Sequence, residues 1–229
     1  MPRRILILAD KKGKMWEFTK EVYNKLVNNP HRTREYELGE VEITKFNDGE
    51  IFSKILTNVR LRTCFYFHDS SMNPQDGLIS LFQVNDALKR SSASKINNVI
   101  PYMSYSRQDR MTEPRVPITA RIVANLISAE AQRVITTDLH NPAITGFYKI
   151  PFDNLKGYIP ISEYLKENCA EFLENAVILA PDVGCAKMAG SYAKRLSLGV
   201  VLADKERKKA GEIGDLKIVG DVSGKNVII

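Results

Sequence analysis

The order in which apolar residues recur along the chain constrains its fold more than any other feature. Apolar runs of strand length, such as ILILA at 5–9, alternate with segments whose apolar residues follow the period of a helix. In residues 15–29, for example, Phe18, Val22 and Leu26 recur every four positions. Strands that alternate with helices pair in parallel through right-handed crossovers. The sequence therefore predicts an α/β fold with largely parallel sheets flanked by helices.

The remaining elements follow from the same two periods and from turn residues. Residues 41–46 and 50–56 flank the tripeptide NDG, which favours a β-hairpin because Asn and Gly accept positive φ. We expect further strands at 64–69, 97–105, 133–140, 176–182 and 199–204, helices at 77–90, 116–131, 161–173 and 183–196, and a hairpin at 217–229. Pro117 is expected in the first turn of its helix, where the missing N–H costs nothing.

The length of 229 residues allows one large or two smaller α/β domains. The stretch 141–160 contains Gly and Pro and is the expected boundary, which gives domains at 1–150 and 151–229. No apolar run approaches the roughly 20 residues that a membrane-spanning helix needs. The run at 5–9 is too short for a signal peptide, and charge follows it at once. We therefore expect a cytoplasmic protein.

The cysteines and histidines indicate neither a disulfide framework nor a zinc site. Cys64, Cys169 and Cys185 are odd in number, far apart and without C-x-x-C spacing, and the histidines are equally scattered. The formal net charge of +6 favours an anionic partner. Nucleotides, phosphosugars and nucleic acids all qualify on charge alone.

Polar side chains gather where the expected strands end. In open α/β sheets, ligands bind beyond the carboxyl ends of the strands. Four such ends carry cations or groups that can bind a metal: Arg107, Gln108, Asp109 and Arg110; Asp138 and His140; Asp182; and Asp204, Lys205 and Arg207. One polar loop would be ordinary. Four loops of this composition favour a site for phosphate and metal.

Several motifs, taken in order, resemble those of the ribose-phosphate pyrophosphokinase (phosphoribosyl pyrophosphate synthetase) family. FNDGE at 46–50 is similar to the family's F-x-D-G-E hairpin, and residues 85–110 are similar to the block that ends in R-Q-D-R. DLH, GFY, DNL, APDVG, DKER and VGDVSGK then follow in the family's order. The resemblance runs from about residue 41 to the last residue. It implies two phosphoribosyltransferase-like domains, the second incomplete.

The resemblance implies transfer of the pyrophosphoryl group from ATP to the C1 hydroxyl of ribose 5-phosphate, which gives phosphoribosyl pyrophosphate and AMP for nucleotide biosynthesis. It also implies an ATP site formed by Arg107 and Gln108 and by the hairpin residues Phe46, Asp48, Gly49 and Glu50. A guanidinium can bind phosphate or stack on a base. Because the family's hairpin serves a neighbouring subunit, we expect a homo-oligomer, which is a hexamer in that family. For Arg110 and Arg115, a solvated position or an intersubunit ion pair is a better interpretation than ATP binding.

The same resemblance implies a magnesium site and a catalytic pair. His140 and Asp182 match positions at magnesium, and Asp138 lies beside His140. Mg²⁺ prefers hard oxygen ligands, so Asp182 is the easier ligand, and His140 also fits a phosphate contact, bound water or a core position. Lys205 and Arg207 match the family's catalytic loop. Arg207 and Asp182 are also expected to bind ribose 5-phosphate.

Three departures from the family's pattern leave alternatives open. Cys185 stands where the family has a glycine, and Lys149 stands where many members have an acid that assists metal binding, although Asp153 is present. The chain also stops at GKNVII, before the family's phosphate loop. We therefore expect these residues to bind ATP without completing the reaction alone.

Two other readings compete with an active enzyme. The first is a non-catalytic regulatory subunit, or an inactive fragment, of such an enzyme. The second is a nucleic-acid-binding domain, for which the chain shows no recognised motif. We expect neither nucleic acid nor a membrane among the partners.

Overall fold

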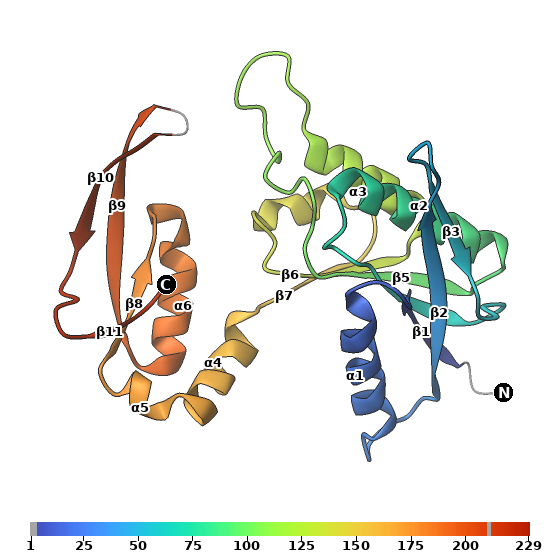
Figure 1. Ribbon diagram of the computed structural model, residues 1–229, viewed down its shortest axis with the longest axis horizontal. Coiled ribbons are helices and arrows are strands. Elements are labelled where there is room, and N and C mark those ends of the chain that lie inside the picture. Colours follow the sequence, from blue (N-terminus) through green and yellow to red (C-terminus); the bar gives the residue numbers. More distant parts are fainter. Residues whose placement is uncertain (1–3, 210–211) are drawn as a thin grey trace. The chain divides into compact units, whose positions relative to one another are not determined.

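The structure is a computed structural model that describes residues 4–209 and 212–229, and for residues 204–209 and 212–216 it describes the backbone alone. The chain divides into two compact units, Met1–Leu155 and Lys156–Ile229. Each unit contains its own sheet (Figure 1). Except for one antiparallel pair in each sheet, the described neighbouring strands are parallel. The predicted α/β class with largely parallel sheets is confirmed.

The first unit is built around a sheet whose seven described strands have the order β3-β2-β1-β4-β5-β6-β7. These strands are β1 (Ile5–Asp10), β2 (Tyr36–Lys45), β3 (Ile51–Ile55), β4 (Thr63–Phe67), β5 (Lys95–Ile100), β6 (Arg133–Thr137) and β7 (Phe152–Leu155). Helix α1 (Met15–Val27) covers one face, and helices α2 (Pro74–Arg90) and α3 (Thr119–Glu130) cover the other (Figure 1). The antiparallel pair of β2 and β3 is the hairpin predicted around NDG.

Alternate residues of the central strands bury opposite faces of this sheet. Leu8 of β1 and Leu81 of α2 are fully buried in one core cluster. Ile7 and Ala9 of β1 face the other way and pack with the partly buried Val22 of α1. Burying a side chain such as leucine contributes about 1.5–3 kcal/mol. Packing on both faces therefore fixes the strand ends from which the site loops leave.

The second unit has a smaller described sheet with the order β10-β9-β8-β11. Its strands are β8 (Ala176–Ala180), β9 (Gly199–Lys209), β10 (Glu212–Val219) and β11 (Asn226–Ile228), and its helical segments are α4 (Tyr158–Asn168), α5 (Ala170–Leu173), η2 (Val183–Cys185) and α6 (Ala186–Leu196). Ala189 and Ala193 of α6 are buried in the same cluster as Ile178 and Ala180 of β8.

The prediction of a hairpin at 217–229 was wrong. Strand β10 pairs with β9, whereas β11 pairs in parallel with β8. The turn residues that suggested a hairpin are present, because Gly220 and Gly224 both have positive φ. Turn residues reverse the chain locally, but burial against distant strands decides which strands pair. Strand β11 therefore lies at an edge of the described sheet.

Several expected boundaries also differ. The strand expected at 97–105 ends at Ile100, and helix α3 begins at Thr119, so Pro117 precedes the helix and does not lie in its first turn. Strand β7 lies within the stretch 141–160 and pairs with β6. None of the described helices combines the length and apolar character that spanning a membrane requires.

Candidate active site

The loop between β5 and α3 is the first part of the candidate site. The Gln108 N–H donates to the Tyr105 carbonyl oxygen at 3.0 Å, and the Gln108 carbonyl oxygen accepts from the Ala120 N–H at 3.1 Å. The Thr119 hydroxyl donates to the Gln108 side-chain oxygen at 2.5 Å. These contacts hold Gln108, and Arg107 before it, against the start of α3.

A cavity of about 260 Å³ opens at this loop. Its lining consists of Arg107, Gln108, Arg110, Thr112, Val116 and Pro117. The guanidinium groups of Arg107 and Arg110 make no hydrogen bond or ion pair with another described residue. Guanidinium groups bind phosphate and carboxylate in bidentate geometry. The cavity therefore suits an anionic ligand.

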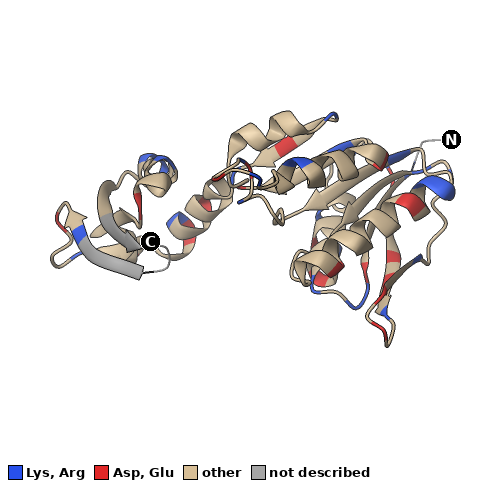
Figure 2. Cartoon of the chain, turned by 90° about the horizontal axis from the view of Figure 1, so that it is seen from above, with Lys and Arg blue, Asp and Glu red and all other residues tan. Residues whose placement is uncertain are grey.

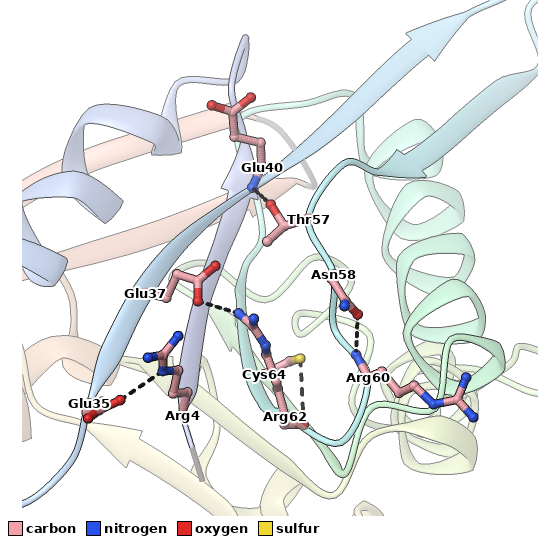
Figure 3. A network of polar contacts seen from close by, with 9 residues as sticks. All are labelled: Arg4, Glu35, Glu37, Glu40, Thr57, Asn58, Arg60, Arg62 and Cys64. Carbon is pink, nitrogen blue, oxygen red and sulfur yellow. Dashed lines mark hydrogen bonds and ion pairs between the residues drawn. The ribbon is translucent and has the colours of Figure 1, made fainter. Parts of the chain in front are cut away.

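The opposite, amino edge of the sheet is different (Figure 3). There Arg4, just before β1, pairs with Glu35 at 2.8 Å, and Arg62, just before β4, pairs with Glu37. These cations already have carboxylate partners, whereas Arg107 at the carboxyl edge has none among the described residues. The carboxyl edge is thus the better candidate for a ligand site, in keeping with other α/β sheets.

The loop after β6 is the second part of the site. Asp138 has a φ of +45°, a conformation that costs a non-glycine residue roughly 1–3 kcal/mol and persists where the surroundings enforce it. Its N–H donates to the Leu155 carbonyl oxygen at 3.0 Å, and the Leu139 N–H donates to the Asn154 side-chain oxygen at 3.0 Å. Both acceptors belong to β7, so β7 holds this turn. Asp138 and His140 are exposed.

One side-chain hydrogen bond joins these two loops. Asn141 Nδ2 donates to Asp109 Oδ2 at 2.7 Å. Asn141 Oδ1 accepts from the Ala143 N–H at 3.0 Å and so caps the 3₁₀ helix η1 (Pro142–Phe147). The structure thus brings together two of the four loops predicted from the sequence. The sequence analysis missed Asn141, although an Asn followed by Pro is a usual signal for a helix start.

The hairpin at 46–50 is closed by a backbone hydrogen bond within its own turn. The Phe46 N–H donates to the Glu50 carbonyl oxygen at 2.8 Å, and Gly49 has a φ of +96°, which explains the glycine. The Phe46 ring is 54% exposed and lies 5.9 Å from the Phe52 ring, centroid to centroid. No hydrogen bond, ion pair or ring contact joins the described hairpin residues, Asp48 included, to the loop after β5.

In the second unit, the exposed Asp182 follows β8, as predicted. Its Oδ1 accepts from the Cys185 N–H at 3.0 Å, so this carboxylate closes the turn that begins η2. Burial raises the pKa of the Cys185 thiol, and its hydrogen bond with Asp182 adds to the effect. Lys205 and Arg207 belong to strand β9, which continues to Lys209. Their side chains, and that of the neighbouring Asp204, lie outside what the structure describes.

The sequence analysis also missed a cavity of about 370 Å³ at the carboxyl ends of β1 and β4, whose lining includes Asp10, Asp69 and Asp76. Asp69 accepts from the Lys14 N–H at 2.7 Å and from the Ser71 N–H at 2.9 Å. Burial opposes ionisation of Asp69, but the hydrogen bond from the Ser71 hydroxyl, together with those from the two N–H groups, outweighs it and lowers the pKa. Burial raises the pKa of Asp10, which accepts from the Lys12 N–H. Both carboxylates fix the loop between β1 and α1.

Comparison with known proteins decides the family. The sequence pattern that describes the N-terminal domain of ribose phosphate pyrophosphokinase matches residues 12–130 of this chain. The chain belongs to the ribose-phosphate pyrophosphokinase family. The family resemblance seen in the motifs is therefore confirmed, and residues 12–130 include both the hairpin and the loop after β5.

Similarity to individual ribose-phosphate pyrophosphokinases supports this assignment. The protein from Wolinella succinogenes is 46% identical over 193 residues, which is 84% of this chain and 62% of that protein. The protein from Helicobacter hepaticus is 41% identical over 213 residues, which is 93% of this chain and 68% of that protein. The crystal structure of phosphoribosylpyrophosphate synthetase from Mycobacterium smegmatis matches with a TM-score of 0.79 and 28% identity, covering 97% of this chain and 69% of that chain. The chain thus spans less than two thirds of the length of several relatives.

Proposed function

We propose that the chain carries the nucleotide-binding part of an enzyme that transfers the pyrophosphoryl group of ATP to the C1 hydroxyl of ribose 5-phosphate. The hydroxyl oxygen attacks the β-phosphorus, and the bond between this phosphorus and the oxygen of the α-phosphate breaks. The hydroxyl proton is released, and the products are phosphoribosyl pyrophosphate and AMP. One observation carries the proposal: the loop with Arg107 and its cavity is tied to the loop with Asp138 and His140.

This reaction needs positioning and positive charge more than covalent help from the protein. Arg107 binds the nucleotide through phosphate contacts or by stacking, and Gln108 adds a hydrogen bond from a side chain already held by Thr119. The hairpin supplies Phe46, Asp48, Gly49 and Glu50 to the ATP of a neighbouring copy. That arrangement agrees with the exposed Phe46 ring, and with the described hairpin residues making no hydrogen bond, ion pair or ring contact to the loop after β5 of the same chain.

The proposal includes magnesium. Mg²⁺ is usually held by one or two carboxylates, several waters and the phosphates of the substrate. No group of three or more His, Cys, Asp or Glu side chains suited to a metal occurs among the described residues. The exposed carboxylates of Asp138 and Asp182 suit this kind of coordination, in which waters and substrate phosphates supply the remaining ligands. His140 fits a contact with phosphate or bound water. When bound, the ion neutralises phosphate charge. Asp153, by contrast, is paired with Arg133.

We assign catalysis to Lys205 and Arg207, and binding of ribose 5-phosphate to Arg207 and Asp182. Cations placed where charge develops on the transferring group lower the barrier most when they are held in position beforehand. The support for these roles is the family's motif order. The side chains of the two cations lie outside the described residues.

The charge pattern suits a small anion better than nucleic acid. Several lysines of the first unit are already paired, such as Lys11 with Glu40 at 2.9 Å and Lys45 with Asp76 at 2.7 Å. Acidic and basic residues are interspersed in the view of Figure 2, whereas nucleic-acid-binding surfaces usually concentrate basic residues in a stripe or patch. We further propose a cytoplasmic homo-oligomer.

Replacing Arg107 tests the proposal. Arg107→Ala should weaken binding of magnesium-ATP by at least about tenfold, because a hydrogen bond to a charged group contributes roughly 1.5–3 kcal/mol. Titration calorimetry on the 229-residue chain measures this. Arg121→Ala, which removes an exposed arginine from α3, is the matched control and should bind as the wild type does. A folded Arg107→Ala chain with unchanged affinity, or a wild type without affinity for ATP, would contradict the proposal.

A further inference from the structure

The contact between Asn141 and Asp109 joins the two loops that the proposed function requires. Asp109 directly follows Arg107 and Gln108 in the loop after β5, and Asn141 directly follows His140 in the loop after β6. The 2.7 Å hydrogen bond between their side chains spans 32 residues of sequence, and both side chains are partly buried. A hydrogen bond to an ionised carboxylate is about twice as strong as one between neutral groups.

The orientation of the Asn141 side chain is unambiguous. Its Nδ2 faces a carboxylate, which accepts, and its Oδ1 faces the Ala143 N–H, which donates. Rotating the amide by half a turn would place two acceptors against each other at Asp109 and two donors against each other at Ala143. Asn141 therefore has two separable roles, an acceptor that caps η1 and a donor that reaches the other loop.

We propose that Asn141 is a positioning residue for the nucleotide, acting through Asp109. This inference rests on the proposed function. On one side, Gln108 is held by Ala120 and Thr119 at the start of α3. On the other side, the next residue, Asp109, is held by Asn141. Because Gln108 and Asp109 are both held, the position of the adjacent Arg107 relative to the loop after β6 is fixed. The position of Arg107 relative to the nucleotide phosphates that the two loops would bind is fixed in the same way.

Backbone strain on both sides of the contact supports this role. Tyr105, two residues before Arg107, has a φ of +61°, and Asp138 has a φ of +45°. Non-glycine residues keep such conformations where the surrounding structure enforces them, and they concentrate at binding and active sites. A hydrogen bond between the two loops restrains the chain beyond each strained residue. It therefore limits relaxation of either loop away from the nucleotide.

Exchanging donor and acceptor tests the inference. Asn141→Asp keeps an oxygen that caps η1 but sets two carboxylates against each other, so it should weaken binding of magnesium-ATP by about tenfold. Adding Asp109→Asn restores a hydrogen bond between amide and carboxylate in the opposite direction. The double variant should recover to within about threefold of the wild type, which a general loss of structure would not do. Thr145→Ala removes a hydrogen bond inside η1 and is the control that should bind normally.

Calorimetry on the full chain separates the outcomes, with circular dichroism as the check on folding. Weak binding by Asn141→Asp and recovery in the double variant would support the inference. If the wild type binds magnesium-ATP and Asn141→Asp binds equally well, the inference is overturned while the proposed function stands. If the single variant is weak and the double variant equally weak, action through Asp109 is overturned. A wild type that binds no ATP would overturn the proposed function and this inference with it.

Discussion

The two units of the chain share a layered α/β plan but differ in what they bury. In the first unit, bulky side chains such as Leu8, Tyr66 and Leu81 are fully buried between strands and helices. In the second unit, the core cluster of described side chains consists of Ile178, Ala180, Ala189, Ala193 and Leu196, and the smaller Val177, Val201 and Ala203 are buried outside it. Stabilisation by burial is roughly proportional to the apolar area removed from water, about 25 cal/mol per Å². The alanine-rich cluster therefore contributes less.

The same contrast appears in how site residues are held. In the first unit, the loops after β5 and β6 are fixed by hydrogen bonds to α3, to β7 and to each other. In the second unit, the Asp182 carboxylate is fixed to its own turn by the Cys185 N–H. Among the described residues, the larger buried core and the more extensively hydrogen-bonded loops thus occur in the same unit.

Replacing one buried isoleucine in each unit tests the difference between the two cores, and it has the largest expected effect of the tests below. Ile96 on β5 is 2% exposed and Ile178 on β8 is 3% exposed, so the two side chains are equally buried. Ile96→Ala should lower the free energy of unfolding of its unit by about 4 kcal/mol, and Ile178→Ala should lower that of its own unit by about 2 kcal/mol. Most apolar side chains of the cluster that contains Ile96 are buried and have little room to move into the cavity, whereas partly buried side chains outnumber buried ones in the cluster of Ile178 and can shift into it.

Hydrogen exchange of the amides in β5 and β8 measures the two changes separately, because protection reports local and subglobal opening. Conservative Ile96→Val and Ile178→Val variants, each expected to cost about 0.5–1.5 kcal/mol, serve as controls. Equal losses for the two alanine variants would show that the second unit is packed as tightly as the first. The contrast drawn above would then fail.

The pH dependence of the free energy of unfolding should also differ between the two units. Burial lowers the pKa of His68 to about 4, and the nearby Asp69 opposes this shift. An unfolded histidine has a pKa of about 6.5, so the unfolded chain binds more protons between pH 6.5 and pH 4. The free energy of unfolding should therefore fall across this window as the pH decreases, by at most about 3 kcal/mol, and level off below it. The second unit contains no histidine.

Urea denaturation at several pH values measures the slope, and His68→Leu should remove most of it. The side chain is 4% exposed and its Nδ1 has no partner, so an apolar replacement leaves no hydrogen-bond partner behind. His31→Gln, at an exposed loop position, is the matched control and should keep the wild-type slope. A slope that survives in His68→Leu would assign the titration to another group.

Local periodicity was sufficient to predict most helices and strands. Burial on one face imposes a repeat that is visible in the sequence, as with Leu81 and Leu88 of α2, both fully buried. Strand partners could not be predicted in this way. Strand β11 pairs with β8, whose residues lie about fifty positions earlier, as in the register of Asn226 with Ala176. Such pairing depends on tertiary packing that a local window does not contain.

The site shows the same limit. Arg107 and Gln108 could be found because they come soon after the apolar strand expected at 97–105, and position after a strand is a local signal even though β5 ends at Ile100. The contact of Asp109 with Asn141 could not be found, since it requires β5 and β6 to be neighbours in the sheet. His68 likewise looked like one of three scattered histidines. Its burial beneath α2 is a property of the fold.

The smallest effect that we expect concerns an ion pair in the second unit. Arg195 Nη2 of α6 lies 2.6 Å from Glu163 Oε1 of α4, and the two side chains are 38% and 59% exposed. Exposed pairs of this kind usually contribute about 0.2–1 kcal/mol, because both ends are solvated and ordering two long side chains costs entropy. A double-mutant cycle with Arg195→Met and Glu163→Gln should give a coupling in that range. Methionine retains most of the apolar stem of arginine, so the cycle isolates the charge.

Salt concentration decides whether this small term alters the comparison between the units. Screening shortens the Debye length from about 10 Å at 0.1 M salt to about 3 Å at 1 M, so a coupling between exposed charges should shrink as salt is added. A coupling that exceeded about 2 kcal/mol and survived at high salt would mean that the pair is effectively buried. The contact between α4 and α6 would then depend on charge more than on the alanine-rich cluster, and the second unit would be stabilised by a different interaction from the first. A weak, salt-sensitive coupling leaves apolar burial as the quantity that separates the two units.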